Sequence, residues 1–235
     1  MTLRMSYFVE PGPLVVAKES GLLEGIELVE TRTTGSPAQL EGLLADQLDV
    51  VVTAIDNLFA WVGAGADVVL VGQVEATIPM GVYAAAEHSS LADLAGTRFA
   101  VDASTNGFAL VARYLFRRGS IDVEYVEVGG VVKRLESLLD GTTDATLLSP
   151  PFDAQARAAG MHEIANVQRE LPAFPGQGLV VQRELIGTPE LEALLDAMRV
   201  SGMIAVDPVG LDLLTQIRGD LGLLPDGIAL RALTV

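Results

Sequence analysis

The sequence contains no cysteine and only two histidines, His88 and His162. Without cysteine the chain can form neither disulfides nor thiolate-bound metal sites, and it has no cysteine nucleophile. The two histidines lie far apart and neither has a partner four residues away, which excludes a metal-binding pair on one helix. We therefore expect no metal site and no cofactor.

Positive charge is also scarce. Fifteen Lys and Arg residues stand against 31 Asp and Glu, which gives a formal net charge of −16, and only Lys18 and Lys133 are lysines. Nucleic acids and anionic membranes bind to basic patches, so we expect neither as a partner. No apolar run reaches the roughly 18 residues that a membrane helix needs, so membrane insertion is not expected either.

The amino-terminal residues lack an export signal, because no basic segment precedes an apolar run and a cleavage site. As written, the sequence predicts a cytoplasmic protein. If a signal has been removed from it, a periplasmic or extracellular location is expected instead.

Half of the residues are hydrophobic, which is enough for a sizeable core. Short apolar runs alternate with amphipathic stretches, and this alternation predicts an α/β fold. We expect strands at residues 3–9, 26–31, 50–52, 68–74, 82–85, 98–101, 123–128, 145–148 and 179–182. We expect helices at residues 14–20, 105–118, 131–139 and 152–159, and helices beginning near residues 36, 57, 189 and 208. Ser36, followed by Pro37 at the first helical position, is the expected N-cap of its helix. Residues 165–177, with several Pro and Gly, are predicted to be an irregular linker.

Two blocks of the sequence resemble one another. Residues 39–49 and residues 133–144 each contain a helical pattern, a tight turn and an aspartate, and an apolar strand follows each. A repeated α/β unit of this kind predicts two similar lobes.

Four segments, in order, resemble a known family. PLVVAKESGL (residues 13–22) resembles its AKE.G.F segment, and residues 43–49 resemble its AL..G..D element. SLADLAGTRFAV (residues 90–101) is similar to S..DL.GK..AV, and residues 138–145 to a second L..G..DA. The family has the type II periplasmic-binding-protein fold and includes the nitrate-, sulfonate-, taurine- and thiamine-precursor-binding proteins (SsuA/THI5-like).

This resemblance implies a two-lobed α/β architecture in which each lobe is a mixed sheet flanked by helices. The first lobe would comprise residues 1–80 and 179–235, and the second lobe residues 81–178. The two hinge crossings are expected at residues 78–81 and 174–178.

The candidate ligand-binding residues are those that follow the predicted strands, because ligands of open α/β sheets bind outside the strands' carboxyl ends, where helix N-termini add N–H donors. Gln177 is added from the second hinge crossing. The first lobe and its hinge contribute Tyr7, Phe8, Glu10, Pro11, Gly35, Ser36, Thr53, Asp56, Asn57, Glu75 and Gln177. The second lobe contributes Asp102, Ser104, Thr105, Asn106, Ser149 and Phe152.

The charges of these candidates suggest the sign of the ligand. Four are acids, and none of the candidates is an Arg or Lys. We therefore hypothesise a neutral or cationic nitrogen-containing ligand, with carboxylates accepting its N–H groups and Tyr7, Phe8 or Phe152 stacking on it. In the alternative, Asp56 and Asp102 only cap the helices that follow them.

Three functions fit the sequence. The first is small-molecule binding in the inter-lobe cleft, as in the substrate-binding proteins of ABC importers, with a permease as the partner if the chain is exported. The second is a cytosolic enzyme of the lyase type, catalysing a dehydration, decarboxylation or elimination with Glu10 or Asp56 as the base. The third is a cytosolic ligand sensor.

Overall fold

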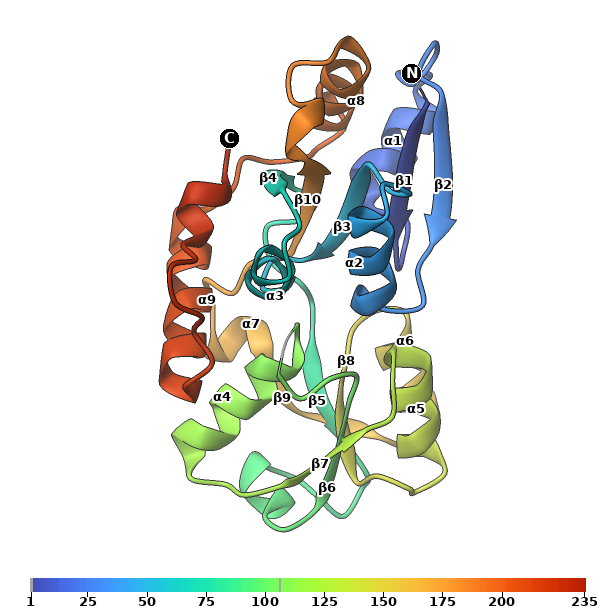
Figure 1. Ribbon diagram of the computed structural model, residues 1–235. Coiled ribbons are helices and arrows are strands. Elements are labelled where there is room, and N and C mark those ends of the chain that lie inside the picture. The colour runs from blue at the N-terminus through green and yellow to red at the C-terminus, as the bar shows by residue number, and fades with distance from the viewer. Residues whose placement is uncertain (1, 106) are drawn as a thin grey trace. The chain divides into compact units, whose positions relative to one another are not determined.

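The computed structural model describes residues 2–105 and 107–235 and divides into two compact units (Figure 1). The first unit comprises the chain up to Ala76, Pro175–Asp212 and Pro225–Val235. The second comprises Thr77–Phe174 and Leu213–Leu224. The chain thus passes from one unit to the other after Ala76, Phe174, Asp212 and Leu224. The first two of these changes lie near the expected hinge crossings, which stay a prediction.

Each unit contains one five-stranded mixed sheet. In the first unit the strand order is β2-β1-β3-β10-β4, and β10 runs antiparallel between β3 and β4. These strands are β1 (Leu3–Tyr7), β2 (Leu28–Arg32), β3 (Val50–Ala54), β4 (Val68–Gln73) and β10 (Gln177–Gln182). The helices of this unit are α1 (Gly12–Glu19), α2 (Ser36–Leu44), α3 (Asn57–Gly63), α8 (Pro189–Val200) and the start of α9 (Pro208–Leu221), with 3-10 turns at Arg183–Leu185 and Leu230–Leu233.

The sheet of the second unit has the order β7-β6-β8-β5-β9, the same arrangement around an antiparallel fourth strand. Its strands are β5 (Gly81–Ala84), β6 (Arg98–Val101), β7 (Glu124–Glu127), β8 (Ala145–Leu148) and β9 (His162–Asn166). Its helices are α4 (Ala109–Gly119), α5 (Val131–Leu139), α6 (Phe152–Ala158) and α7 (Val167–Glu170), with a 3-10 turn at Leu91–Leu94.

Each sheet buries its apolar side chains against its own helices. In the first unit Leu3 and Met5 of β1 are fully buried and belong to a cluster that includes Leu191 and Leu194 of α8. In the second unit Tyr83 of β5 packs with residues of α5, β8 and α6. Each unit therefore has its own core.

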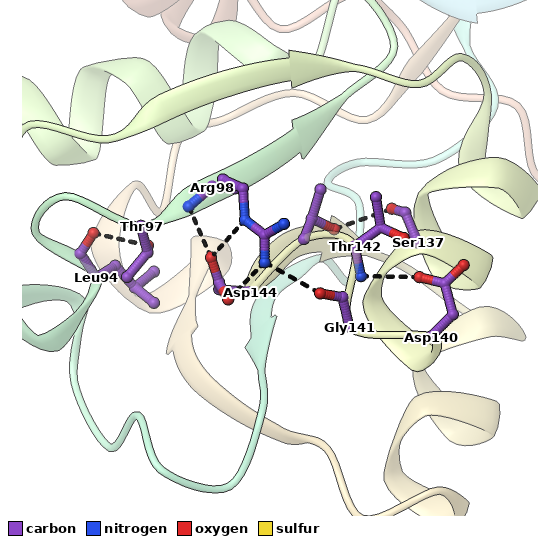
Figure 2. A network of polar contacts seen from close by, with 9 residues as sticks. Leu94, Thr97, Arg98, Ser137, Asp140, Gly141, Thr142 and Asp144 are labelled. Atoms are coloured by element: carbon purple, nitrogen blue, oxygen red, sulfur yellow. Dashed lines mark hydrogen bonds and ion pairs between the residues drawn. The ribbon is translucent and has the colours of Figure 1, made fainter.

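An arginine–aspartate pair occurs at equivalent places in both units and explains the repeated sequence blocks. In the first unit Asp49 accepts hydrogen bonds from the backbone N–H of Arg4 at 2.7 Å and from its Nη2 at 2.6 Å. In the second unit Asp144 accepts the same two bonds from Arg98, at 2.8 and 3.3 Å (Figure 2). Each arginine also donates to a carbonyl of the preceding tight turn, that of Asp46 or Gly141. The pair joins the beginning of β1 or β6 to the turn that leads into the central strand of the same sheet, β3 or β8.

Three expectations about local structure were wrong. Residues 165–177 are not an irregular linker, because they include the end of β9, the short helix α7 and the first residue of β10. The helix expected from residue 105 begins at Ala109, since Gly107 has a positive φ of 61° that a helix cannot contain. Ser36 is the first residue of α2 rather than its N-cap, which is Gly35.

The expected lobes were residues 1–80 with 179–235 and residues 81–178, and this division stays a prediction. The compact units of the structure divide the end of the chain differently. Residues 213–224 belong to the second unit. There the Nε2 of Gln216 donates to the Tyr114 hydroxyl at 3.2 Å, and the Nη2 of Arg218 donates to the carbonyl of Thr105 at 3.5 Å. These contacts attach most of α9 to the second unit.

Candidate functional site

A buried polar pair lies at the carboxyl end of β3. Asn57, the first residue of α3, donates from its Nδ2 to the Thr53 hydroxyl at 2.8 Å, and both side chains are buried. Asp56 lies between these two residues in the sequence, and its side chain is also buried, at 3% exposure. Asp56 is the N-cap residue of α3, as the alternative reading expected, but its side chain makes no capping hydrogen bond to the helix among the described residues.

Glu75 and Gln177 are brought together beside this pair. Gln177 is opposite Ala54 in the β10–β3 register, and its backbone N–H donates to Oε1 of Glu75 at 3.3 Å. Burial raises the pKa of Glu75, against the opposing effect of the Gln177 N–H. The first unit thus gathers Thr53, Asp56, Asn57, Glu75 and Gln177 around the ends of β3 and β4; we call these five residues the strand-end cluster.

Gly176 and the side chain of Gln73 fix the backbone around the strand-end cluster. A Cβ on Gly176 would lie 2.4 Å from the carbonyl oxygen of Glu75, so only glycine allows the two segments to approach this closely. The fully buried Gln73 donates to the carbonyls of Glu75 and Ala76, and its Oε1 accepts the backbone N–H of Asp207 at 2.6 Å. Gln73 was not among the candidates predicted from the sequence, although its position as the last residue of an apolar strand is a usable signal.

The candidates that follow β1 form a separate group. Pro11 is buried as the N-cap of α1, and Phe8 is half-buried. Glu10 forms an ion pair with Nζ of Lys18 at 2.5 Å, and Lys18 also contacts Glu30 at 2.6 Å.

The Tyr7 hydroxyl donates to Glu30 at 2.7 Å, and its ring belongs to the core of the unit. Burial, with a further contribution from the bond to Glu30, raises the pKa of Tyr7 to about 12. A lysine therefore does reach the strand-end residues, contrary to the expectation from the sequence. It was missed because it lies within α1 and extends its long side chain back to them.

The amino end of α2 adds Gly35 and Ser36. The Thr33 hydroxyl donates to the carbonyl of Gly35 at 2.8 Å and holds this turn, and Ser36 is buried. One turn on, the fully buried Gln39 donates to the carbonyl of Val52 at 3.1 Å. Among the described residues its Oε1 has no hydrogen-bond partner, so a buried acceptor lies beside the ends of β1 and β3.

In the second unit the candidates lie on loops tied to its sheet. Asp102 and Thr105 are exposed, whereas the backbone N–H of Ser104 donates to Glu127 at 2.8 Å and its carbonyl accepts from Arg113. Asn106 lies outside the described residues.

The two candidates that follow β8 are both half-buried. Ser149 precedes α6, and its carbonyl accepts the backbone N–H of Phe152 at 2.9 Å. Phe152 begins α6 and packs against the core cluster of the second unit, so at least part of its ring is used for packing.

A second missed cation is Arg134, on the first turns of α5. Its Nη1 donates to the carbonyl of Leu147 near the end of β8, and its buried Nε has no partner among the described residues. Burial lowers the pKa of Arg134, while Asp102 acts in the opposite direction. Side chains from neighbouring helices also reach the strand ends. The candidates predicted from the sequence were only the residues that follow strands, so they did not include these side chains.

Comparisons with known proteins identify relatives. A family model described as NMT1/THI5 like matches residues 10–207. The ligand-binding component of an ABC-type import system from Staphylococcus aureus, with zinc bound, has a TM-score of 0.77 and 13% identity, covering 96% of this chain and 94% of that one. The alkanesulfonate-binding protein SsuA from Xanthomonas axonopodis pv. citri, bound to MOPS, has a TM-score of 0.74 and 18% identity over 100% and 98%. No curated protein matches the chain.

At these identities the two solved structures show the fold alone, and they confirm the predicted α/β class with two mixed sheets flanked by helices. Among the described residues, none of the helices is both long and apolar enough to cross a membrane.

Proposed function

Because this chain belongs to the NMT1/THI5-like family, we propose that it acts as a substrate-binding protein and that its strand-end cluster binds part of a small molecule. The observation that carries the proposal is the burial of Glu75 together with its incomplete hydrogen bonding. Its side chain is half-buried, burial raises its pKa, and among the described residues its carboxylate accepts one long hydrogen bond, at 3.3 Å from the Gln177 N–H. A desolvated carboxylate gains free energy from any further donor.

The ligand group that best fits the strand-end cluster is a neutral or cationic nitrogen with N–H donors. Glu75 and Asp56 supply carboxylates, and Thr53 and Asn57 already bond to one another. An anionic group placed here would meet like charges. The sulfonate relatives share the fold at low identity, so their ligands do not carry over to this chain.

A panel of small probes tests this proposal by thermal shift. We expect 4-aminopyrimidine or benzylamine to raise the unfolding midpoint and methanesulfonate to leave it unchanged. A probe at a hundred times its Kd stabilises by about 2.7 kcal/mol, which corresponds to roughly 5 °C or more for a chain of this size. Stabilisation by the sulfonate alone would contradict the proposed ligand class.

The matched variants are Glu75→Gln and, in the same unit, Glu19→Gln at an exposed position. Glu75→Gln removes the acceptor charge and should abolish the shift produced by benzylamine. Glu19→Gln removes the same charge elsewhere and should retain it. An equal loss in both variants would show that the bulk charge of the chain, rather than Glu75, attracts the probe.

An ABC permease is the partner that this function implies for an exported chain, because the similar solved structures include a ligand-binding component of an ABC-type import system. One ion pair disfavours the lyase alternative. Its candidate base Glu10 is paired with Lys18 at 2.5 Å, which occupies the carboxylate with a cation.

A further inference from the structure

A cavity of about 300 Å³ lies in the second unit, at the opposite end of the sheet from the strand-end candidates. Its wall includes Tyr125, the second residue of β7, and the loop from α4 to that strand. Because β6 and β7 are parallel, this loop lies at their amino ends, whereas Asp102 follows the carboxyl end of β6. The volume is at the lower limit of about 300 Å³ that is typical of small-molecule sites.

Two arginines of α4 line this cavity. Arg113 and Arg117 are one helical turn apart and therefore share a face of α4. Although the chain has a net charge of −16, neither arginine forms an ion pair within the part of the chain that the structure describes. Two cationic donors are thus available at one cavity.

Arg113 is held in place on two sides. Its Nη1 donates to the carbonyl of Ser104, and its guanidinium lies over the ring of Tyr125, 5.8 Å from the centroid. Burial raises the pKa of Tyr125 to about 12, so its hydroxyl stays protonated. An arginine fixed in this way loses little conformational entropy when it binds a ligand.

The rest of the cavity wall combines apolar side chains with one acidic side chain. Ile121 and Leu221 supply apolar surface, and Asp122 supplies the single carboxylate. Two of the last carbonyls of α4, those of Arg117 and Phe116, already accept the backbone N–H groups of Ser120 and Ile121. The three charged side chains carry a net charge of +1.

We propose that this cavity is a second binding site, separate from the strand-end cluster, for a small organic carboxylate with an apolar body. Arg113 and Arg117 bind the carboxylate, because a guanidinium offers paired N–H donors that match its two oxygens. Ile121 and Leu221 cover the apolar body. Asp122 at the rim disfavours ligands of higher negative charge.

Benzoate and its uncharged isostere benzamide serve as probes, followed by amide chemical shifts of the full chain in NMR titrations. We expect benzoate to shift the amides of residues 117–125 in a saturable way and benzamide to shift them little. Raising NaCl from 50 to 300 mM should weaken benzoate binding, because the partly exposed ion pair is screened.

Arg117→Gln tests the site directly, and Arg118→Gln is its matched control. Both residues are exposed on α4, but Arg118 lies over Tyr114 and does not line the cavity. We expect Arg117→Gln to weaken benzoate binding about tenfold and Arg118→Gln to leave it unchanged. Equal binding of benzamide, an equal loss in both variants, or shifts confined to the strand-end cluster would overturn the proposal.

Discussion

Glu75 couples the strand-end cluster to pH. Its folded pKa is raised above the reference value of 4.5 by burial, so folding favours its protonated form. Glu75 therefore contributes most to stability at low pH, and this contribution is lost as the pH rises through the folded pKa. We expect Glu75→Gln, which keeps an acceptor for the Gln177 N–H, to be increasingly more stable than the wild type as the pH rises from 4 to 8.

Urea unfolding at a series of pH values checks this prediction, with Glu19→Gln as the control for loss of one acidic charge. A stability difference between Glu75→Gln and the wild type that does not change with pH would show that Glu75 is not desolvated in solution.

Selecting the residues that follow predicted strands identified some residues at the strand ends and missed others, for a physical reason. Asn57 and Glu75 come within three residues of the ends of β3 and β4, so their order in the chain shows where they lie. Lys18 and Arg134 reach the strand ends from neighbouring helices through long side chains, and their positions depend on how helix and sheet pack. Sequence order predicts short polar groups at strand ends better than it predicts long cations.

At the scale of elements, the close approach of β10 to the end of β4 depends on Gly176. An added Cβ would lie 2.3 Å from Glu75 Cγ and 2.4 Å from its carbonyl oxygen, and a backbone atom cannot give way cheaply. We expect Gly176→Ala to destabilise the first unit by about 1–3 kcal/mol in urea unfolding. The control is Gly12→Ala, where the added Cβ has nothing within 4 Å and should be neutral or slightly stabilising. Equal effects of the two substitutions would contradict this account.

The elements with strong periodic patterns were predicted best. The helix at residues 131–139 and the strand at residues 145–148 have the expected bounds. Residues 165–177 were mistaken for a linker because their Pro and Gly residues suggest irregular chain, whereas β9 is completed by pairing with β5, a contact distant in sequence. Tertiary pairing of this kind leaves little periodic signal in a short segment.

At the scale of the whole molecule, the repeated blocks predicted two similar units, and each has a mixed sheet and its own arginine–aspartate pair. Units with separate cores are expected to unfold as separate cooperative transitions. The chain has a single tryptophan, Trp61, which is buried in the first unit and reports on that unit alone.

Neutralising each aspartate separately tests this independence. Asp49→Asn and Asp144→Asn each weaken hydrogen bonds to a charged arginine, which cost about 1.5–3 kcal/mol when lost. The larger effect is expected for Asp49, whose side chain is 9% exposed against 28% for Asp144. In urea unfolding followed by Trp61 fluorescence, we expect the midpoint to fall for Asp49→Asn and to stay unchanged for Asp144→Asn. Far-UV circular dichroism, which reports on both units, should detect the destabilisation caused by either substitution. If Asp144→Asn moves the Trp61 transition as far as Asp49→Asn does, the two units unfold as one, because a residue of the second unit then stabilises the first.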